Sequence, residues 1–187
     1  MFFGTKRPKR VAVFISGSGS TLQTVLDQHH ELQIELIVTN KKSALGVLKA
    51  KRFGKKVYFF AKDQSYNDLQ KILDLNKIDS IFLAGFMKIL PADFIQNWQG
   101  RILNIHPSLL PRFPGLDAAK KSYDAGEDVG VSIHEVTEVV DEGRIYLQMN
   151  ALRKNKFSKI NFEMTMLYLR RTEQHLLREV SNRWNIL

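Results

Sequence analysis

The sequence of 187 residues contains no cysteine. This absence excludes disulfide bonds, thiolate nucleophiles and cysteine metal sites, and it is compatible with a reducing compartment. No apolar run reaches the roughly 18 residues that a membrane-spanning helix needs. The apolar stretch Val11–Ile15, behind the basic N-terminus, is also shorter than the core of about 7–15 residues in a secretory signal. We therefore expect a soluble, cytoplasmic protein with no membrane partner.

Unbalanced charge is also absent from most of the chain. The net charge of +9 divides into +4 over residues 1–10, zero over residues 11–150 and +5 over residues 151–187. This distribution argues against a nucleic-acid-coating protein, although basic ends are compatible with contacts to phosphates. The length, with 44% hydrophobic and 25% charged residues, predicts one folded domain over residues 1–187.

Short apolar stretches alternate with helical patterns along the first two thirds of the chain. Strands are expected at 11–15, 34–38, 57–60, 81–84 and 102–105, with helices between them. This order predicts an α/β fold, a mostly parallel, twisted, Rossmann-type sheet with helices on both faces. Beyond residue 110 the pattern predicts a helix over 116–125, an antiparallel strand pair at 131–136 and 145–149, and one long helix over roughly 161–184.

A glycine-serine loop, Ile15-Ser16-Gly17-Ser18-Gly19-Ser20-Thr21, follows the first strand. Gly17 and Gly19 let the backbone approach an anion, and the helix N-terminus behind them offers N–H groups. Ser20 and Thr21 are candidates to cap that helix, to donate to phosphate, or both. The loop alone does not distinguish a phosphate site from a plain turn.

The type of phosphate ligand is restricted by what the loop lacks. A dinucleotide site needs a third glycine and an acidic residue after the second strand, but that strand ends Val38-Thr39-Asn40-Lys41-Lys42. The Gly-Lys-Ser/Thr of a Walker loop is also absent. Once these two ligand classes are excluded, a sugar phosphate or a mononucleotide-like ligand remains as the phosphate ligand that this loop could bind.

Asn104 and His106 occupy alternate positions of the fifth predicted strand, so both side chains point to one face. The carboxyl end of such a strand is where open α/β sheets bind ligands. An amide donates to a developing oxyanion, and an imidazole donates to it or manages a proton. The alternative is that Asn104 caps a turn and His106 is a structural histidine.

A second group of polar residues follows the helix at 116–125, with Ser132 and His134 on a strand and Asp141 in an Asp-x-Gly segment. A carboxylate there orients a histidine or anchors a water, although an ordinary turn is the more common explanation of such a segment taken alone. His106, His134 and Asp141 are also a possible three-ligand metal set. No His-x-x-x-His pair supports a metal and no G-x-S-x-G elbow supports serine hydrolysis, so we predict no metal.

Five segments together resemble the glycinamide ribonucleotide (phosphoribosylglycinamide) formyltransferases, a branch of the folate-dependent formyltransferase superfamily. The segments are ISGSGSTLQ (15–23), AGFMKIL (84–90), NIHPSLLPRFPGL (104–116), GVSIHEVT (130–137) and VDEG (140–143). The resemblance covers residues 10–150 well and the tail poorly. It implies formyl transfer from 10-formyl-tetrahydrofolate, as co-substrate, to the amine of glycinamide ribonucleotide in de novo purine biosynthesis, by a monomer or homodimer.

The resemblance also implies roles for individual residues. Asn104 and His106 stabilise the oxyanion, Asp141 orients His106 and a relay water, and Ser132, beside Asp141, and His134 support the site. The substrate phosphate is held at Gly17, Gly19, Ser20 and Thr21. The folate pocket is bordered by Met87, Lys88, Ile89 and Leu90, with Asn104 also touching the folate.

The chain departs from the family pattern near the folate loop and in the tail. After Asp141, Glu142 replaces a small or neutral residue of the family pattern and Arg144 replaces a proline. Gln64 or a neighbour occupies the position where the family usually has an arginine, and Gln174 aligns with an acidic residue. These differences bear on the acceptor and leave the formyl-transfer residues unchanged. Two alternatives stay open, a formyltransferase for another amine such as an amino-sugar nucleotide, and a non-catalytic module that binds a phosphosugar or RNA.

Overall fold

The computed structural model describes residues 8–27, 32–155 and 160–183, without the side chains of 181–183. By their internal contacts the described residues form two compact units, one made of those up to Met87 and from Arg178 onwards, and one made of those from Lys88 to Leu177.

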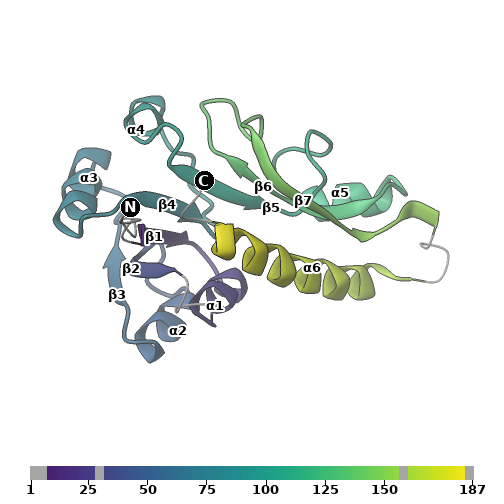
Figure 1. Cartoon of the computed structure of the whole chain (residues 1–187), viewed down its shortest axis with the longest axis horizontal. Coiled ribbons are helices and arrows are strands. Elements are labelled where there is room, and N and C mark those ends of the chain that lie inside the picture. The colour runs from purple at the N-terminus through teal and green to yellow at the C-terminus, as the bar shows by residue number, and fades with distance from the viewer. Residues whose placement is uncertain (1–7, 28–31, 156–159, 184–187) are drawn as a thin grey trace, which may run out of the picture. The chain divides into compact units, whose positions relative to one another are not determined.

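The first unit is a parallel β-sheet with three helices (Figure 1). Along the chain its elements are β1 (Arg10–Ile15), α1 (Ser20–Asp27), β2 (Gln33–Thr39), α2 (Gly46–Arg52), β3 (Lys56–Phe59), α3 (Tyr66–Leu75) and β4 (Ser80–Leu83). The strands lie in the order β3-β2-β1-β4, so the chain adds β2 and β3 on one side of β1 and then returns to add β4 on the other side. Because parallel crossovers are right-handed, this reversal puts α3 on the opposite face from α1 and α2.

The central strands of this unit are apolar on both faces because helices cover both faces. Val11–Ile15 of β1 and all of β4 are buried, as the continuous apolar stretches predict. The helix α3 begins with a capping box, in which Ser65 and Asp68 satisfy each other's backbone N–H groups. The carboxyl end of β1 leads into the glycine-serine loop.

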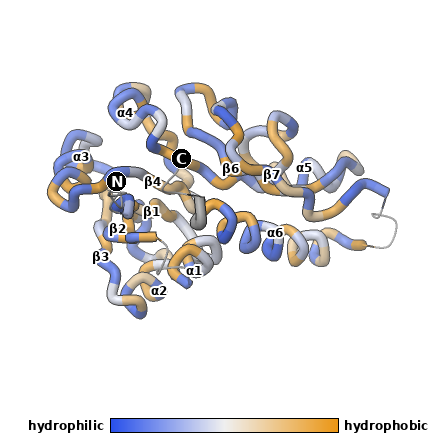
Figure 2. Tube along the Cα trace, viewed as in Figure 1, coloured by the Kyte–Doolittle hydropathy of each residue, from blue (hydrophilic) through white to orange (hydrophobic). Residues whose placement is uncertain are grey.

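The second unit contains α4 (Ala92–Asn97), β5 (Ile102–His106), α5 (Ala118–Asp124), β6 (Val129–Glu135), β7 (Ile145–Leu152) and, up to residue 177, the helix α6 (Phe162–Arg183). Its strands lie in the order β5-β6-β7, and both pairs are antiparallel. Hydrophobic and hydrophilic residues alternate along α6 (Figure 2), which buries Thr165, Leu169 and Leu176 on one face.

The predicted α/β fold class is confirmed, including the antiparallel strand pair near the C-terminus and the long final helix. The bounds of the expected elements shift by a few residues at most; the predicted strand at 145–149, for example, extends to Leu152. The count of one domain stays a prediction. Among the described residues, no helix combines the length and apolar character that crossing a membrane requires.

Candidate active site

Pairing of β5, β6 and β7 arranges the polar residues of the second unit in two rows. Asn104 of β5 lies opposite His134 of β6, and His106 lies opposite Ser132, which in turn lies opposite Gln148 of β7. Directly opposed residues of antiparallel strands share one face of the sheet. The register therefore brings together Asn104, His106, Ser132 and His134, which the sequence predicted as site residues.

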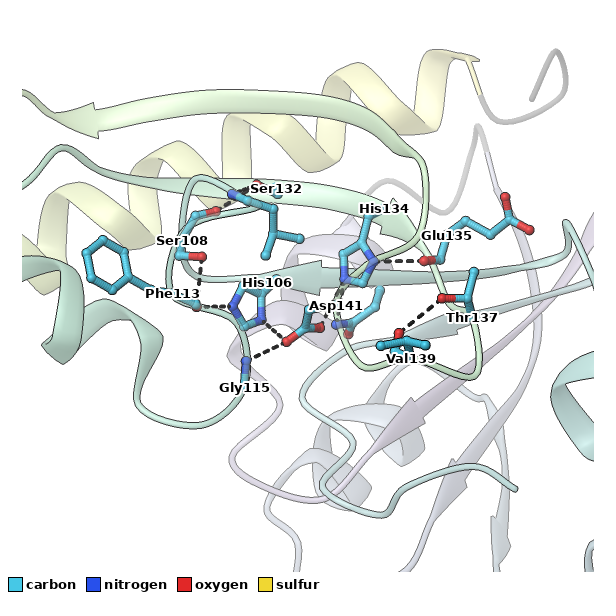
Figure 3. Close-up of polar contacts among 12 residues, drawn as sticks. His106, Ser108, Phe113, Gly115, Ser132, His134, Glu135, Thr137, Val139 and Asp141 are labelled. Atoms are coloured by element: carbon cyan, nitrogen blue, oxygen red, sulfur yellow. Dashed lines mark hydrogen bonds and ion pairs between the residues drawn. The ribbon is translucent and has the colours of Figure 1, made fainter. Parts of the chain in front are cut away.

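Both ring nitrogens of His106 have partners in its buried position (Figure 3). Nε2 lies 3.0 Å from the main-chain carbonyl oxygen of Phe113, and Nδ1 lies 3.3 Å from Oδ2 of Asp141. Both partners only accept hydrogen bonds, but the contact with Phe113 is the shorter one and has hydrogen-bond geometry, so in the neutral ring we assign the hydrogen to Nε2, and Nδ1 pairs with Asp141 only when the ring is protonated. Burial lowers the pKa of His106 below its usual value, although the Phe113 carbonyl and the charge of Asp141 oppose the shift.

Asp141 joins three partners at the carboxyl end of the loop that follows β6. Its Oδ2 accepts the N–H of Gly115 at 2.8 Å, and its Oδ1 lies 3.3 Å from Nε2 of His134. Burial raises the pKa of Asp141, but the contacts with His134, Gly115 and His106 outweigh it, and the net pKa is lowered. Asp141 has a φ of 59°, a left-handed conformation that aspartate tolerates better than most residues.

His134 fixes the orientation of Asn104. Its Nδ1 lies 2.8 Å from the main-chain oxygen of Glu135 and therefore carries a hydrogen. In the neutral ring Nε2 accepts from Nδ2 of Asn104 at 3.2 Å, and only the protonated ring pairs with Asp141 through the same nitrogen. An amide nitrogen has two hydrogens, so the second N–H of Asn104 can donate to a ligand.

Ser132 engages the turn after β5. Its hydroxyl donates to the carbonyl of Ser108 at 2.7 Å and accepts from the N–H of Leu110 at 3.1 Å and from Nε2 of Gln148 at 2.8 Å. None of these hydrogen bonds is to Asp141, beside which the resemblance put Ser132. The serine supports the site by holding the segment that presents Phe113 to His106.

The glycine-serine loop belongs to the first unit, and there Gly19 has a specific conformational role. Gly19 has a φ of 66°, and a Cβ at this position would lie 2.7 Å from Cα of Gly46. Its carbonyl accepts from the N–H of Gln23, so Gly19 takes the cap position of α1. Ser20 and Thr21, considered as caps, lie inside the helix instead.

The segment from Met87 to Leu90 crosses the boundary between the two units. The N–H of Met87 donates to Oγ of Ser16 at 2.8 Å, and this hydroxyl donates to Oδ1 of Asn40. The side chains of Met87 and Ile89 are 67% and 80% exposed, whereas Leu90 is buried. Because the side chain of Leu90 is buried, only its main-chain atoms are available for contacts with a ligand.

The sequence identified neither Phe113, Ser108 nor Gln148 as part of this site. Phe113 acts through its main-chain carbonyl, at a φ of 53°, which side-chain chemistry does not reveal. The Phe113-Pro114-Gly115 stretch is a turn signal that could have pointed to it. Among the described residues, no group of three or more histidine, aspartate and glutamate side chains is arranged to hold a metal ion.

Residues 9–159 match the family model described as formyl transferase. The chain belongs to the formyl transferase family. The resemblance to the formyltransferases that the sequence motifs indicated is thus confirmed. The matched residues include both the glycine-serine loop and the cluster from Asn104 to Asp141.

Formyl transferases similar to this chain include a bacterial protein and part of a larger animal protein. This chain is 39% identical over 151 residues to phosphoribosylglycinamide formyltransferase of Haemophilus influenzae, and the alignment covers 75% of this chain and 71% of that protein. It is 41% identical over 157 residues to the trifunctional purine biosynthetic protein adenosine-3 of Drosophila melanogaster, covering 77% of this chain. It spans only 11–15% of the trifunctional proteins of two Drosophila species and of Homo sapiens.

The solved structures of formyl transferases give the same fold. The glycinamide ribonucleotide transformylase 1 of Geobacillus kaustophilus superimposes with a TM-score of 0.87 at 30% identity, over 97% of this chain and all of that one. The phosphoribosylglycinamide formyltransferase of Anaplasma phagocytophilum superimposes with a TM-score of 0.82 at 31% identity, over 89% of this chain and 81% of that one.

Proposed function

We propose that this formyl transferase moves the formyl group of 10-formyl-tetrahydrofolate to the amine of glycinamide ribonucleotide, a step of purine biosynthesis. The observation that carries the proposal is the cluster of Asn104, His106 and Asp141, which combines an amide donor with an imidazole–carboxylate pair. The names of the bacterial relatives support the choice of acceptor.

The chemistry needs an oxyanion donor and a route for one proton. The acceptor amine attacks the formyl carbon, its oxygen gains negative charge, and the carbon–nitrogen bond to the folate breaks as the amine proton reaches the leaving nitrogen. Asn104 donates its second amide N–H to the oxyanion, because the first is held by His134. A donor fixed in advance stabilises the charge without reorganisation during the reaction.

His106 and Asp141 hold the proton in transit. Because Nε2–H is donated to Phe113, the basic nitrogen of the ring is Nδ1, next to Asp141. A proton taken up at Nδ1 turns this contact into an ion pair. In this geometry His106 contributes to proton transfer, and it would have to exchange Phe113 for the oxyanion to act as the donor expected from the resemblance.

The remaining predicted residues bind the two substrates. Gly17, Gly19, Ser20 and Thr21 hold the acceptor phosphate at the start of α1, where N–H groups and the helix dipole favour an anion. Met87, Lys88, Ile89 and Leu90, with Asn104, border the folate. We further propose a cytoplasmic monomer or homodimer that needs no metal, and one functional domain over residues 1–187.

One assay tests the acceptor and the site together. The purified protein is mixed with 10-formyl-tetrahydrofolate and glycinamide ribonucleotide, and release of deformylated folate is followed. We expect turnover by the wild type and losses of two or more orders of magnitude in His106→Ala and Asp141→Asn. Transfer to an amino-sugar nucleotide alone would contradict the acceptor. Salt-sensitive RNA binding with no formyl transfer would favour the non-catalytic module.

A further inference from the structure

Three side chains stand in one row across the antiparallel sheet of the second unit. His106 of β5 lies opposite Ser132 of β6, and Ser132 lies opposite Gln148 of β7. The row connects the histidine of the proposed mechanism to a glutamine that the mechanism does not use. The contacts along this row assign a role to that glutamine.

The hydroxyl of Ser132, in the middle of the row, has no hydrogen-bonding capacity left. It is fully buried, donates its one hydrogen to Ser108, and accepts from Leu110 and Gln148. A hydroxyl has one hydrogen and two lone pairs. Every part of the group is therefore used, and the loss of one partner leaves a buried polar atom unsatisfied.

Gln148 contributes both hydrogens of its amide nitrogen to this arrangement. Nε2 lies 2.8 Å from Oγ of Ser132 and 2.8 Å from the main-chain oxygen of Leu110. A carboxylate at this position would present only acceptors to two groups that need a donor. Gln148 thus ties β7 to the turn of residues 108–113.

That turn ends at the carbonyl that faces His106. Oγ of Ser108 donates to the main-chain oxygen of Arg112 at 2.7 Å and lies 3.2 Å from that of Phe113. The Phe113 oxygen in turn accepts from Nε2 of His106 at 3.0 Å. The turn therefore supplies the acceptor that favours a hydrogen on Nε2, in competition with the Asp141 carboxylate, which lies 3.3 Å from Nδ1 and favours a hydrogen there.

We infer that Gln148 is a positioning residue that selects the tautomer of His106. By holding the 108–113 turn through Ser132 and Leu110, it keeps the Phe113 carbonyl on Nε2 and leaves Nδ1 as the basic nitrogen beside Asp141. The kinetic part of this inference rests on the proposed formyl transfer. The tautomer itself can be measured without any substrate.

The variants Gln148→Leu and Gln148→Glu remove the donors, and Gln148→Asn retains the amide on a side chain one methylene shorter. The matched control is Asn150→Leu, because Asn150 is an exposed residue on the same face of β7 whose side chain makes no hydrogen bond within the described ranges. A small displacement of a catalytic group costs up to about a hundredfold in rate. We expect all three Gln148 variants to lose between about tenfold and a hundredfold in kcat, with the KM values for both substrates unchanged, because the shorter Gln148→Asn side chain also displaces the amide.

The decisive readout is the ¹⁵N spectrum of His106 at pH 7, together with the acid limb of the kcat profile. We expect the Nε2–H tautomer in the wild type and in Asn150→Leu, and a mixture with the Nδ1–H tautomer and a shifted acid limb in the Gln148 variants. An unchanged tautomer and an unshifted limb in all folded Gln148 variants would overturn the inference, even if kcat or stability fell. An inactive wild type would refute the proposed function instead, and the spectrum would still decide the role of Gln148.

Discussion

Nδ1 of His106 lies 3.3 Å from Oδ2 of Asp141, while Nε2 of the same ring is held by the carbonyl of Phe113. The histidine therefore faces a carboxylate with its basic nitrogen and has no ring nitrogen left over for another contact in this geometry. The relationship is compatible with the proton transfer proposed for this pair, and it sets the expected responses of both residues to pH and to substitution.

The Asp141→Asn variant is expected to be less stable than the wild type at pH 7 by about 1–3 kcal/mol, because the N–H of Gly115 exchanges a buried charged acceptor for a neutral amide. The lowered pKa of Asp141 means that its stabilisation is present above the unfolded pKa of about 3.9 and is lost as the pH falls through the folded pKa. The difference in unfolding free energy should therefore shrink below about pH 4.

The control for this measurement is Asp117→Asn, the same change at an exposed residue that also has a positive φ. Urea unfolding of the three proteins between pH 3 and pH 8 checks the prediction. Equal stability of Asp141→Asn and the wild type at pH 7 would contradict the role of the Asp141 carboxylate in the cluster.

His106 is expected to be neutral at pH 7, because burial lowers its pKa below the ordinary value. As the pH falls, the unfolded chain binds this proton before the folded protein does, so the protein loses stability from about pH 6.5 downwards. Histidine titration by NMR, with His106→Gln to assign the signal, measures the midpoint. A midpoint above 6.5 would show that the charge of Asp141 outweighs burial.

Asn104→Ala is expected to lower kcat by about 10²–10³-fold, the usual cost of removing one oxyanion donor. The KM for the acceptor should change little, because the donor acts mainly in the transition state. Initial rates with both substrates, and an unfolding curve to confirm the fold, test this. A loss of kcat below tenfold would show that a group other than Asn104 donates to the oxyanion.

Gly143→Ala is expected to cost roughly 1–3 kcal/mol, since overpacking of a tight contact strains the backbone. A Cβ at Gly143 would collide with the main-chain carbonyl of Glu135, and so displace the loop that carries Asp141. Gly17→Ala is the control, because a Cβ there meets nothing within 4 Å. Chemical unfolding compares the two. Equal stability of the two variants would contradict the tight fit.

Gly19→Ala is expected to raise the KM for glycinamide ribonucleotide more than the KM for the folate. The substitution strains a positive φ and presses against Gly46, and so it distorts the loop proposed to hold the phosphate. Calorimetry with inorganic phosphate, beside the kinetics, tests the loop directly. Equal phosphate affinity in Gly19→Ala and the wild type would remove the loop from the phosphate site.

The sequence by itself determined the order of the elements and much of the site. The strand at Val11–Ile15 and the alternation that follows are local patterns of apolar residues, and local patterns are readable without partners. Asn104 and His106 share a face because residues two apart in any strand do so. The Asp-x-Gly segment likewise pointed to a loop carboxylate at Asp141.

Only the tertiary structure decided how these residues are connected. The register of β5, β6 and β7 puts Ser132 and Gln148 in line with His106, and it depends on pairing between residues far apart in the chain. The positive φ of Phe113 aims a carbonyl, a group that every residue has, at Nε2 of His106. Side-chain identity does not encode such a main-chain contact, because it arises when the whole turn is held in place.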